Sequence, residues 1–163
     1  MPRVITVPVY TYEELAPAAQ ARALGDWAGS VDFPWTSDYR EELSHIEETL
    51  GVSITYELDT GYYYSHYSWD RQTKWDRGLT LQAAQKFTSR GFCAGEGFWD
   101  TFKELFKGTG SARVALDGAL SAFFKEWVDD LEHYFSEEGF KEHLECIWDS
   151  GFVFSQHGEF IGA

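Results

Sequence analysis

Apolar side chains recur along this sequence mainly at helical spacing, every three or four positions. The clearest pattern covers residues 111–135 and is typical of an amphipathic helix with one buried face. A second apolar stripe predicts a helix over 37–50 that ends at Gly51, because glycine readily takes the left-handed conformation that closes many helices. Weaker helical spacing predicts further helices over 12–28, 80–89, 97–106 and 136–148.

Strand patterns are shorter and lie near both ends and in the middle of the chain. Residues 4–10 are β-branched, 52–58 alternate with period two, and 62–69 follow a turn, as in a hairpin. Two short strands about a Gln-His-Gly turn are predicted within 152–161. We therefore expect an α+β fold in which N-terminal, central and C-terminal strands share a small antiparallel sheet, covered by five to six helices, in one compact domain over 1–163.

The composition indicates a folded, strongly acidic protein. The 163 residues include 27 Asp and Glu against 13 Lys and Arg, which gives a net charge of −14, and 18% are aromatic. Disordered acidic chains are poor in aromatic residues, so a packed core is expected. The charge disfavours direct binding to nucleic acid or to anionic membranes, which depends on Lys and Arg. No apolar run is long enough to cross a bilayer, and two cysteines without a signal-like start favour a reducing cytosol.

Two stretches hold the whole net charge. Residues 38–59 contain seven acidic and one basic residue, and 126–149 contain nine acidic and one basic, so they contribute −6 and −8. Within the second stretch, Glu126, Asp129 and Asp130 share one helix face and repel one another. As a helix, this stretch would carry about one net charge per 4.5 Å, close to the 3.4 Å per phosphate of a DNA strand. It is either a solvated face that keeps the protein soluble or a docking surface for a basic partner.

Candidate chemistry is sparse. The sequence Gly-Phe-Cys-Ala-Gly around Cys93 matches the motif of a nucleophile elbow with Cys in place of Ser. Its flanking residues predict helices, however, rather than the strand that precedes such a turn. His133 and His143 each lie one helical turn from an acidic residue or a cysteine, yet neither set completes a zinc or di-metal site. Because neither metal-ligand set is complete, we expect no bound metal. Because no phosphate-binding or dinucleotide motif is present, we also expect no cofactor.

Both ends and the middle of the chain resemble a group of small, largely uncharacterised bacteriophage and prophage proteins. Residues 9–24 look like their usual start, a "YTFDEL" segment followed by an "A-x-x-x-A" helix. Residues 88–93 with 98–102 are similar to a "T-G-Y-C … L-x-P-L" segment, and 135–142 with 152–160 to the ending "S-D-E-A-x-x-E … Y-x-F-T-x-D-G". The resemblance implies a mobile-element origin and no known catalytic residue. Small acidic phage proteins are often similar in character to anti-restriction and anti-CRISPR inhibitors, which place carboxylates in the nucleic-acid groove of a host nuclease.

We therefore expect a non-enzymatic phage inhibitor of a bacterial defence complex, acting in the host bacterial cytoplasm as an acidic nucleic-acid mimic that binds a basic partner. The carboxylates expected to form its docking surface are Glu126, Asp129, Asp130, Glu132, Glu137, Glu138, Glu142 and Glu145, helped by Glu41, Glu42, Glu47 and Glu48. Two alternatives stay open. One is a small cytosolic enzyme that uses Cys93 with a histidine such as His143, or a carboxylate cluster. The other is an antitoxin-like protein that neutralises one basic partner.

Overall fold

The computed structural model describes residues 7–59, 64–71, 79–91, 95, 97–146 and 152–162. The chain divides into two compact units: unit 1 consists of Met1–Asp32 with His133–Ala163, and unit 2 of Phe33–Glu132. Each unit has buried apolar side chains of its own. The single domain expected over 1–163 stays a prediction.

Unit 2 combines helices with one β-hairpin. Its elements are α2 (Thr36–Leu50), β1 (Val52–Asp59), β2 (Tyr64–Arg71), α3 (Leu81–Ala84), α4 (Gly97–Thr109) and α5 (Ala112–Tyr134), the last of which continues two residues past the boundary of the unit. The periodic stretch 111–135 is thus confirmed as α5, whose apolar face is buried. The helix expected over 80–89 is much shorter, because only α3 is helical there.

Helix α2 forms and ends as its sequence pattern predicts. Its apolar stripe is buried and consists of Tyr39, Leu43, Ile46 and Leu50. Gly51 follows with φ 62°, and its N–H donates to the carbonyl of Glu47 at 2.8 Å. The left-handed glycine therefore closes the helix and turns the chain into β1.

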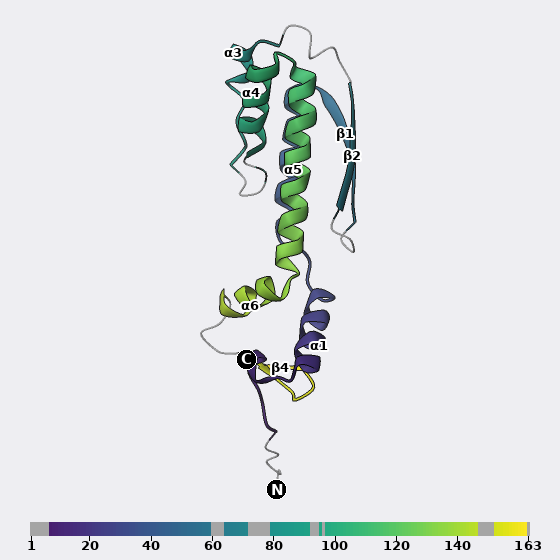
Figure 1. Cartoon of the computed structure of the whole chain (residues 1–163), viewed down its shortest axis with the longest axis vertical. Coiled ribbons are helices and arrows are strands. Elements are labelled where there is room, and N and C mark those ends of the chain that lie inside the picture. The colour runs from purple at the N-terminus through teal and green to yellow at the C-terminus, as the bar shows by residue number, and fades with distance from the viewer. Residues whose placement is uncertain are drawn as a thin grey trace. The chain divides into compact units, whose positions relative to one another are not determined.

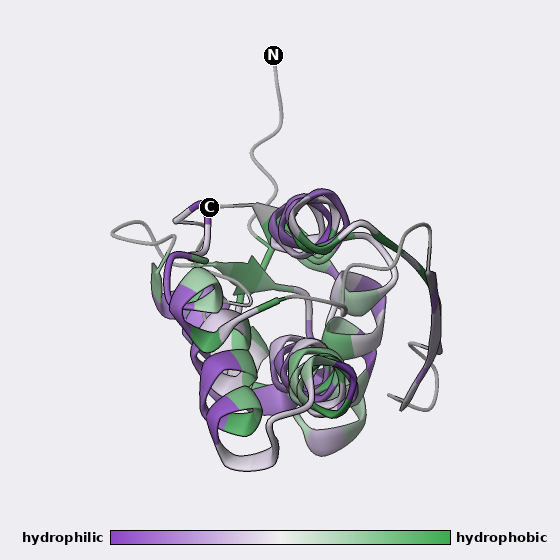
Figure 2. Cartoon of the chain, turned by 90° about the horizontal axis from the view of Figure 1, so that it is seen from above, coloured by the Kyte–Doolittle hydropathy of each residue, from purple (hydrophilic) through white to green (hydrophobic). Residues whose placement is uncertain are grey.

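The hairpin and α4 both pack against α5, which lies between them in Figure 1. β1 and β2 are antiparallel, with Tyr56 opposite Tyr67, and the rings of both lie on Phe124 of α5, with centroids 5.5 and 4.9 Å away. On α4, Phe98 meets Phe123 of α5 edge to face at 6.2 Å. Both hydrophobic and hydrophilic residues occur on the helices (Figure 2), as expected of amphipathic elements.

Unit 1 joins the two ends of the chain. Its elements are the 3₁₀ turn η1 (Tyr12–Glu14), α1 (Pro17–Ala28), α6 (Glu137–Cys146), β3 (Val153–Phe154) and β4 (Phe160–Gly162). The continuous helix expected over 12–28 is interrupted. Ala16 is extended, with ψ 151°, because the residue before a proline avoids the helical region, and α1 begins at Pro17.

The α+β class is confirmed, but the described strands form two separate two-stranded sheets instead of one shared sheet. β1 pairs with β2 in unit 2, and β3 pairs with β4 in unit 1. The N-terminal segment joins the second pair through one bridge, in which the backbone N–H groups of Tyr10 and Phe154 donate to each other's carbonyls at 3.0 and 2.9 Å. Of the strand expected over 4–10, residues 4–6 lie outside the described residues and 7–9 form no strand.

A glycine allows the turn between β3 and β4 to approach α1. Gly158 is buried with φ +82°, and a Cβ at this position would overlap the backbone carbonyl of Ala19 in α1. Its own N–H donates to the carbonyl of Ser155 at 3.0 Å. The predicted Gln-His-Gly turn is confirmed, and it packs against α1 because its last residue has no side chain.

Candidate functional site

The twelve predicted docking carboxylates differ widely in exposure, and they belong to both units. Eight are exposed: Glu41, Glu48, Asp129, Glu132, Glu137, Glu138, Glu142 and Glu145. Three are half-buried (Glu47, Glu126 and Asp130), and Glu42 is fully buried. The set therefore contains structural carboxylates as well as surface ones.

Glu42 departs most clearly from the expected surface position. Its side chain is 0% exposed and accepts three hydrogen bonds, from Trp99 Nε1 at 2.8 Å, from Ser89 Oγ at 3.1 Å and from the backbone N–H of Arg90 at 3.4 Å. It connects α2 with α4 and with the chain that follows α3. A partner could not reach this carboxylate, so Glu42 does not belong to a docking surface.

Glu47 and Glu48, which also lie on α2, have partners that stabilise unit 2. Glu47 accepts from the backbone N–H of Ile54 at 2.6 Å, across the turn from α2 to β1. Glu48 forms an ion pair with Arg90 at 2.7 Å. Among the described residues, Glu41 is exposed and has no hydrogen bond or ion pair, and it is the member of the α2 group that remains available to a partner.

The carboxylates on one face of α5 have partners within unit 2. Glu126 accepts from the backbone N–H of Gly95 at 3.2 Å, Asp129 forms an ion pair with Lys125, and Asp130 accepts from the hydroxyl of Tyr39 at 2.7 Å. The repulsion expected among these three is therefore partly offset inside the protein.

Tyr39 shows how closely α2 and α5 pack around Asp130. Its ring stacks on Trp127 with centroids 4.7 Å apart and an interplanar angle of 4°. Burial, and then the hydrogen bond to Asp130, raise the pKa of the Tyr39 hydroxyl far above its usual value of 10. The phenol stays protonated and donates to the carboxylate, so Asp130 has a structural role.

Helix α6 carries a stripe of exposed acidic side chains in unit 1. Glu138, Glu142 and Glu145 are spaced by four and three residues, which places them on one helix face. His133 Nε2 lies 3.1 Å from Glu142 Oε2, whereas Glu138 and Glu145 make no hydrogen bond or ion pair within the described part of the chain. We call Glu138, Glu142 and Glu145 the α6 acidic stripe.

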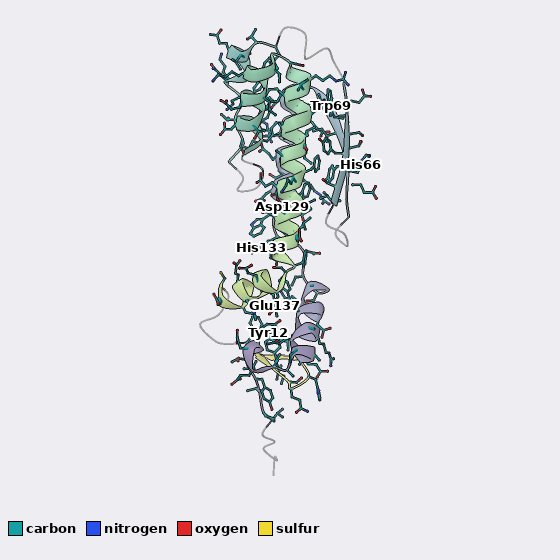
Figure 3. The ribbon with its side chains drawn as sticks, viewed as in Figure 1. Tyr12, His66, Trp69, Asp129, His133 and Glu137 are labelled. Atoms are coloured by element: carbon teal, nitrogen blue, oxygen red, sulfur yellow. The ribbon has the colours of Figure 1, made fainter. Side chains whose placement is uncertain are left out.

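Two more predicted carboxylates flank this stripe along the chain. Glu137 pairs with Lys141 at 2.7 Å, one turn along α6, and Glu132 is exposed near the end of α5 with no ion pair among the described residues. Figure 3 labels Asp129 on α5, His133 at its end and Glu137 at the start of α6.

The residues proposed for catalysis do not form a site in the described structure. Cys93 lies outside the described residues. His143 faces an apolar cavity, where burial lowers its pKa, and no described carboxylate hydrogen-bonds to its ring. Cys146 is a free, exposed thiol, and no group of three or more His, Cys, Asp or Glu side chains suited to a metal ion occurs among the described residues.

The aromatic run before Trp69 packs inward where it is described. The Tyr67 hydroxyl donates to the carbonyl of Asp117 on α5 at 3.1 Å, and Trp69 Nε1 donates to the carboxylate of the same residue at 2.5 Å. His66, by contrast, is exposed on β2 (Figure 3). These contacts hold the hairpin on α5 rather than offering stacked rings to a nucleic acid.

Comparison with known proteins adds no further constraint. No protein-family model, curated protein or solved structure matches this chain. Among the described helices, none is both long and apolar enough to cross a membrane.

Proposed function

We propose that this chain is a non-enzymatic acidic protein that binds the nucleic-acid-binding surface of a basic bacterial protein. In this proposal it serves a phage, in the host cytoplasm, as an inhibitor of a defence nuclease complex of the anti-restriction or anti-CRISPR type. The α6 acidic stripe is the observation that supports the proposal most.

The stripe is electrostatically unfavourable within the protein. Like charges three or four residues apart destabilise a helix by about 0.2–0.5 kcal/mol per pair. The helix dipole favours Glu138 in the first turn of α6 but disfavours Glu145 in the last turn. Of its three carboxylates, Glu142 alone has a described partner, His133. A cationic partner would relieve both effects.

The wider surroundings of the stripe are acidic as well. Unit 1 contains ten Asp and Glu residues but three Lys and Arg residues. A surface of this kind repels nucleic acid and attracts a groove lined with Lys and Arg, which is the chemistry of a nuclease's DNA or RNA channel. Attraction between such surfaces mainly accelerates association and weakens as salt increases.

The binding test uses the immobilised full chain, a bacterial host lysate and a salt gradient from 0.05 to 0.5 M. We expect it to capture a nucleic-acid-binding protein that elutes with rising salt and is displaced by duplex DNA. The identity of the captured protein distinguishes the two hypotheses: a component of a defence complex supports an inhibitor, whereas a toxin supports an antitoxin-like role.

A matched pair of charge-reversal variants locates the contact. Glu138→Lys/Glu145→Lys changes the stripe, and Asp32→Lys/Glu104→Lys makes the same change in charge at exposed positions outside both acidic stretches. We expect the stripe variant to slow association with the captured protein by about tenfold or more at low salt, and the control variant to slow it much less.

Function is tested by plating phage on strains that carry a restriction or CRISPR system. Expression of the wild-type chain and of the control variant should raise the plating efficiency on at least one such strain, and the stripe variant should not. Equal capture at 0.05 and 0.5 M salt, or equal loss in both variants, would show that electrostatic docking at α6 is wrong.

A further inference from the structure

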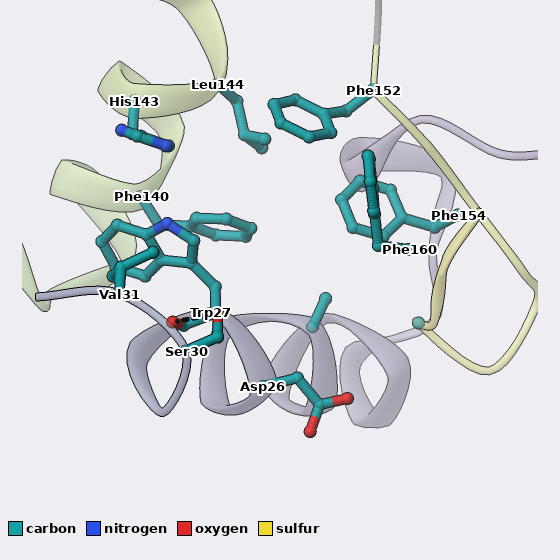
Figure 4. A pocket seen from close by; sticks show the side chains of 12 residues that line it. Asp26, Trp27, Ser30, Val31, Phe140, His143, Leu144, Phe152, Phe154 and Phe160 are labelled. Carbon is teal, nitrogen blue, oxygen red and sulfur yellow. Dashed lines mark hydrogen bonds between the residues drawn. The ribbon is translucent and has the colours of Figure 1, made fainter. Parts of the chain in front are cut away.

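Unit 1 contains a cavity of about 310 Å³ between α1, α6 and the β3–β4 pair. Its lining includes Trp27, Phe140, His143, Phe152, Phe154 and Phe160. Figure 4 shows Trp27 and Phe140 on one side of the space and the other three phenylalanines on the opposite side. We propose that this cavity binds a small, uncharged, flat aromatic molecule that carries a hydrogen-bonding group for His143.

Size and lining both fit a small apolar ligand. Ligand pockets in proteins usually measure about 300–1,000 Å³ and are lined mainly by apolar and aromatic side chains, whereas packed interiors contain few voids larger than a water molecule. The walls are rings that already contact one another. Trp27 and Phe140 have centroids 5.0 Å apart, and Phe152 and Phe160 meet edge to face at 4.8 Å. A flat aromatic molecule between the two sides would extend these ring contacts.

The cavity has a route to solvent. Phe160, which forms part of its wall, is 56% exposed, whereas Phe140 and Phe154, which also line it, are 2% and 3% exposed. A ligand could therefore enter beside Phe160 and bury its apolar surface against the inner rings.

His143 is the polar group that gives this cavity specificity. Its ring lies against Trp27, with centroids 5.4 Å apart, and makes no hydrogen bond to any described residue. Burial lowers its pKa, so at neutral pH the ring is uncharged and offers one N–H donor and one nitrogen acceptor. Trp27 Nε1 is also buried without a described partner, but neighbouring atoms cover it, so we assign the ligand's hydrogen bond to His143.

The charges around the cavity favour an uncharged ligand. Asp26 is the carboxylate among the lining residues, but its side chain points away from the space in Figure 4 and lies 3.6 Å from Arg22. Desolvation disfavours a charged ligand of either sign in this apolar cavity, and the acidic surface of unit 1 further disfavours an anion. This inference does not depend on the proposed docking function.

The test measures binding of N-phenyl-1-naphthylamine to the full chain by fluorescence. This probe is uncharged, has flat aromatic rings and carries one N–H group, and 1-phenylnaphthalene has similar rings without that group. We expect saturable binding of both probes. His143→Phe should weaken binding of the amine by about five- to tenfold and leave binding of 1-phenylnaphthalene within twofold. His157→Phe, an exposed histidine outside this cavity, is the matched control and should change neither.

A second variant tests the location. Ala23 lines the cavity from α1, and Ala23→Leu should reduce the affinity for both probes at least tenfold while the circular dichroism spectrum stays native. Unchanged probe affinity in a folded Ala23→Leu protein, or an equal effect of His143→Phe on both probes, would overturn the proposal. So would tighter binding of phenyltrimethylammonium than of the amine.

A side chain of the protein itself, that of Trp148, could fill the cavity in place of a ligand, and the experiment must distinguish these two cases. Trp148 belongs to residues 147–151, which lie outside the described residues. If the wild-type chain binds neither probe and Trp148→Ala binds both, the cavity is filled by the chain's own side chain and the proposal is wrong. Binding to the wild type supports the proposal, because the cavity is then open to a ligand.

Discussion

Replacing Glu42 tests whether a residue from the acidic stretch of α2 is structural. Its carboxylate accepts hydrogen bonds from Trp99 Nε1 at 2.8 Å, Ser89 Oγ at 3.1 Å and the backbone N–H of Arg90 at 3.4 Å, and it is completely buried. The neighbouring Glu41 is exposed and has no described partner. Glu41→Ala is therefore a control on the same helix, one residue away.

The expected cost follows from these contacts. Hydrogen bonds to a charged acceptor contribute about 1.5–3 kcal/mol, and a buried donor left without an acceptor costs about 1–3 kcal/mol. Glu42→Ala removes all three hydrogen bonds and leaves the buried N–H of Trp99 without an acceptor, so we expect it to lower the free energy of unfolding by about 3–5 kcal/mol. Glu42→Gln keeps one accepting oxygen and should cost about 1–3 kcal/mol. Glu41→Ala should change stability by less than about 0.5 kcal/mol.

The assay is urea unfolding monitored by tryptophan fluorescence and analysed by linear extrapolation. Five of the seven tryptophans belong to unit 2, which also contains Glu42, so fluorescence reports mainly on the unit that the substitution affects. Circular dichroism at 222 nm monitors the helices of both units. If the two units unfold separately, the shift should be confined to the transition with the larger fluorescence change.

Equal unfolding midpoints for Glu42→Ala and Glu41→Ala would refute this reasoning, because they would mean that Glu42 is solvated rather than buried. A cost for Glu42→Gln as large as that for Glu42→Ala would show that the negative charge, and not the number of accepting oxygens, decides the stability. Of these two results, the first alone would return Glu42 to the set of possible docking residues.

Three further predictions concern single side chains. Gly158→Ala should destabilise unit 1 by at least about 2 kcal/mol in thermal or urea unfolding, because φ is +82° and the new Cβ would overlap the carbonyl of Ala19. Tyr39→Phe should lower the free energy of unfolding by about 1–2 kcal/mol, because the hydrogen bond to Asp130 is lost. Burial raises the pKa of Tyr39, so this tyrosine ionises at lower pH in the unfolded chain than in the folded one. The stability of the wild-type protein should therefore fall as the pH rises past 10, which urea unfolding at pH 9 and pH 11 would measure. Burial lowers the pKa of His143, so as the pH falls the imidazole is protonated in the unfolded chain before it is protonated in the folded one. The stability of the protein should therefore fall as the pH drops below about 6.5, and an NMR titration of the imidazole should give a pKa below that value.

Helical periodicity predicted α2 and α5 because both bury one apolar stripe along their length. The same pattern contained the position of Glu42, which lies three residues after Tyr39 and four before Ile46 and therefore falls on the buried face. Counting charge along the chain ignored that geometry. A carboxylate on an apolar stripe is the signal of a buried hydrogen-bond acceptor.

The interruption of the N-terminal helix could also have been predicted, whereas the cavity could not. The residue before Pro17 disfavours helical backbone, and this local effect outweighs the helical spacing that continues across it. The cavity is lined from α1, α6 and the β3–β4 pair, and more than 100 residues of sequence separate α1 from the other two. Periodicity describes which face of each element is buried, but not how closely three faces fill the space between them.

Helix α6 links the two proposals, because its outer face carries the acidic stripe and its inner face lines the cavity. Isolated helices of ten residues are marginal in water, so α6 depends on contacts such as that between Phe140 and Trp27, whose rings lie 5.0 Å apart. Phe140→Ala should therefore weaken both capture of the partner and binding of N-phenyl-1-naphthylamine. Glu138→Lys/Glu145→Lys should weaken the first alone, and His143→Phe the second alone. If Phe140→Ala abolished probe binding but left salt-dependent capture unchanged, the docking contact would lie away from α6.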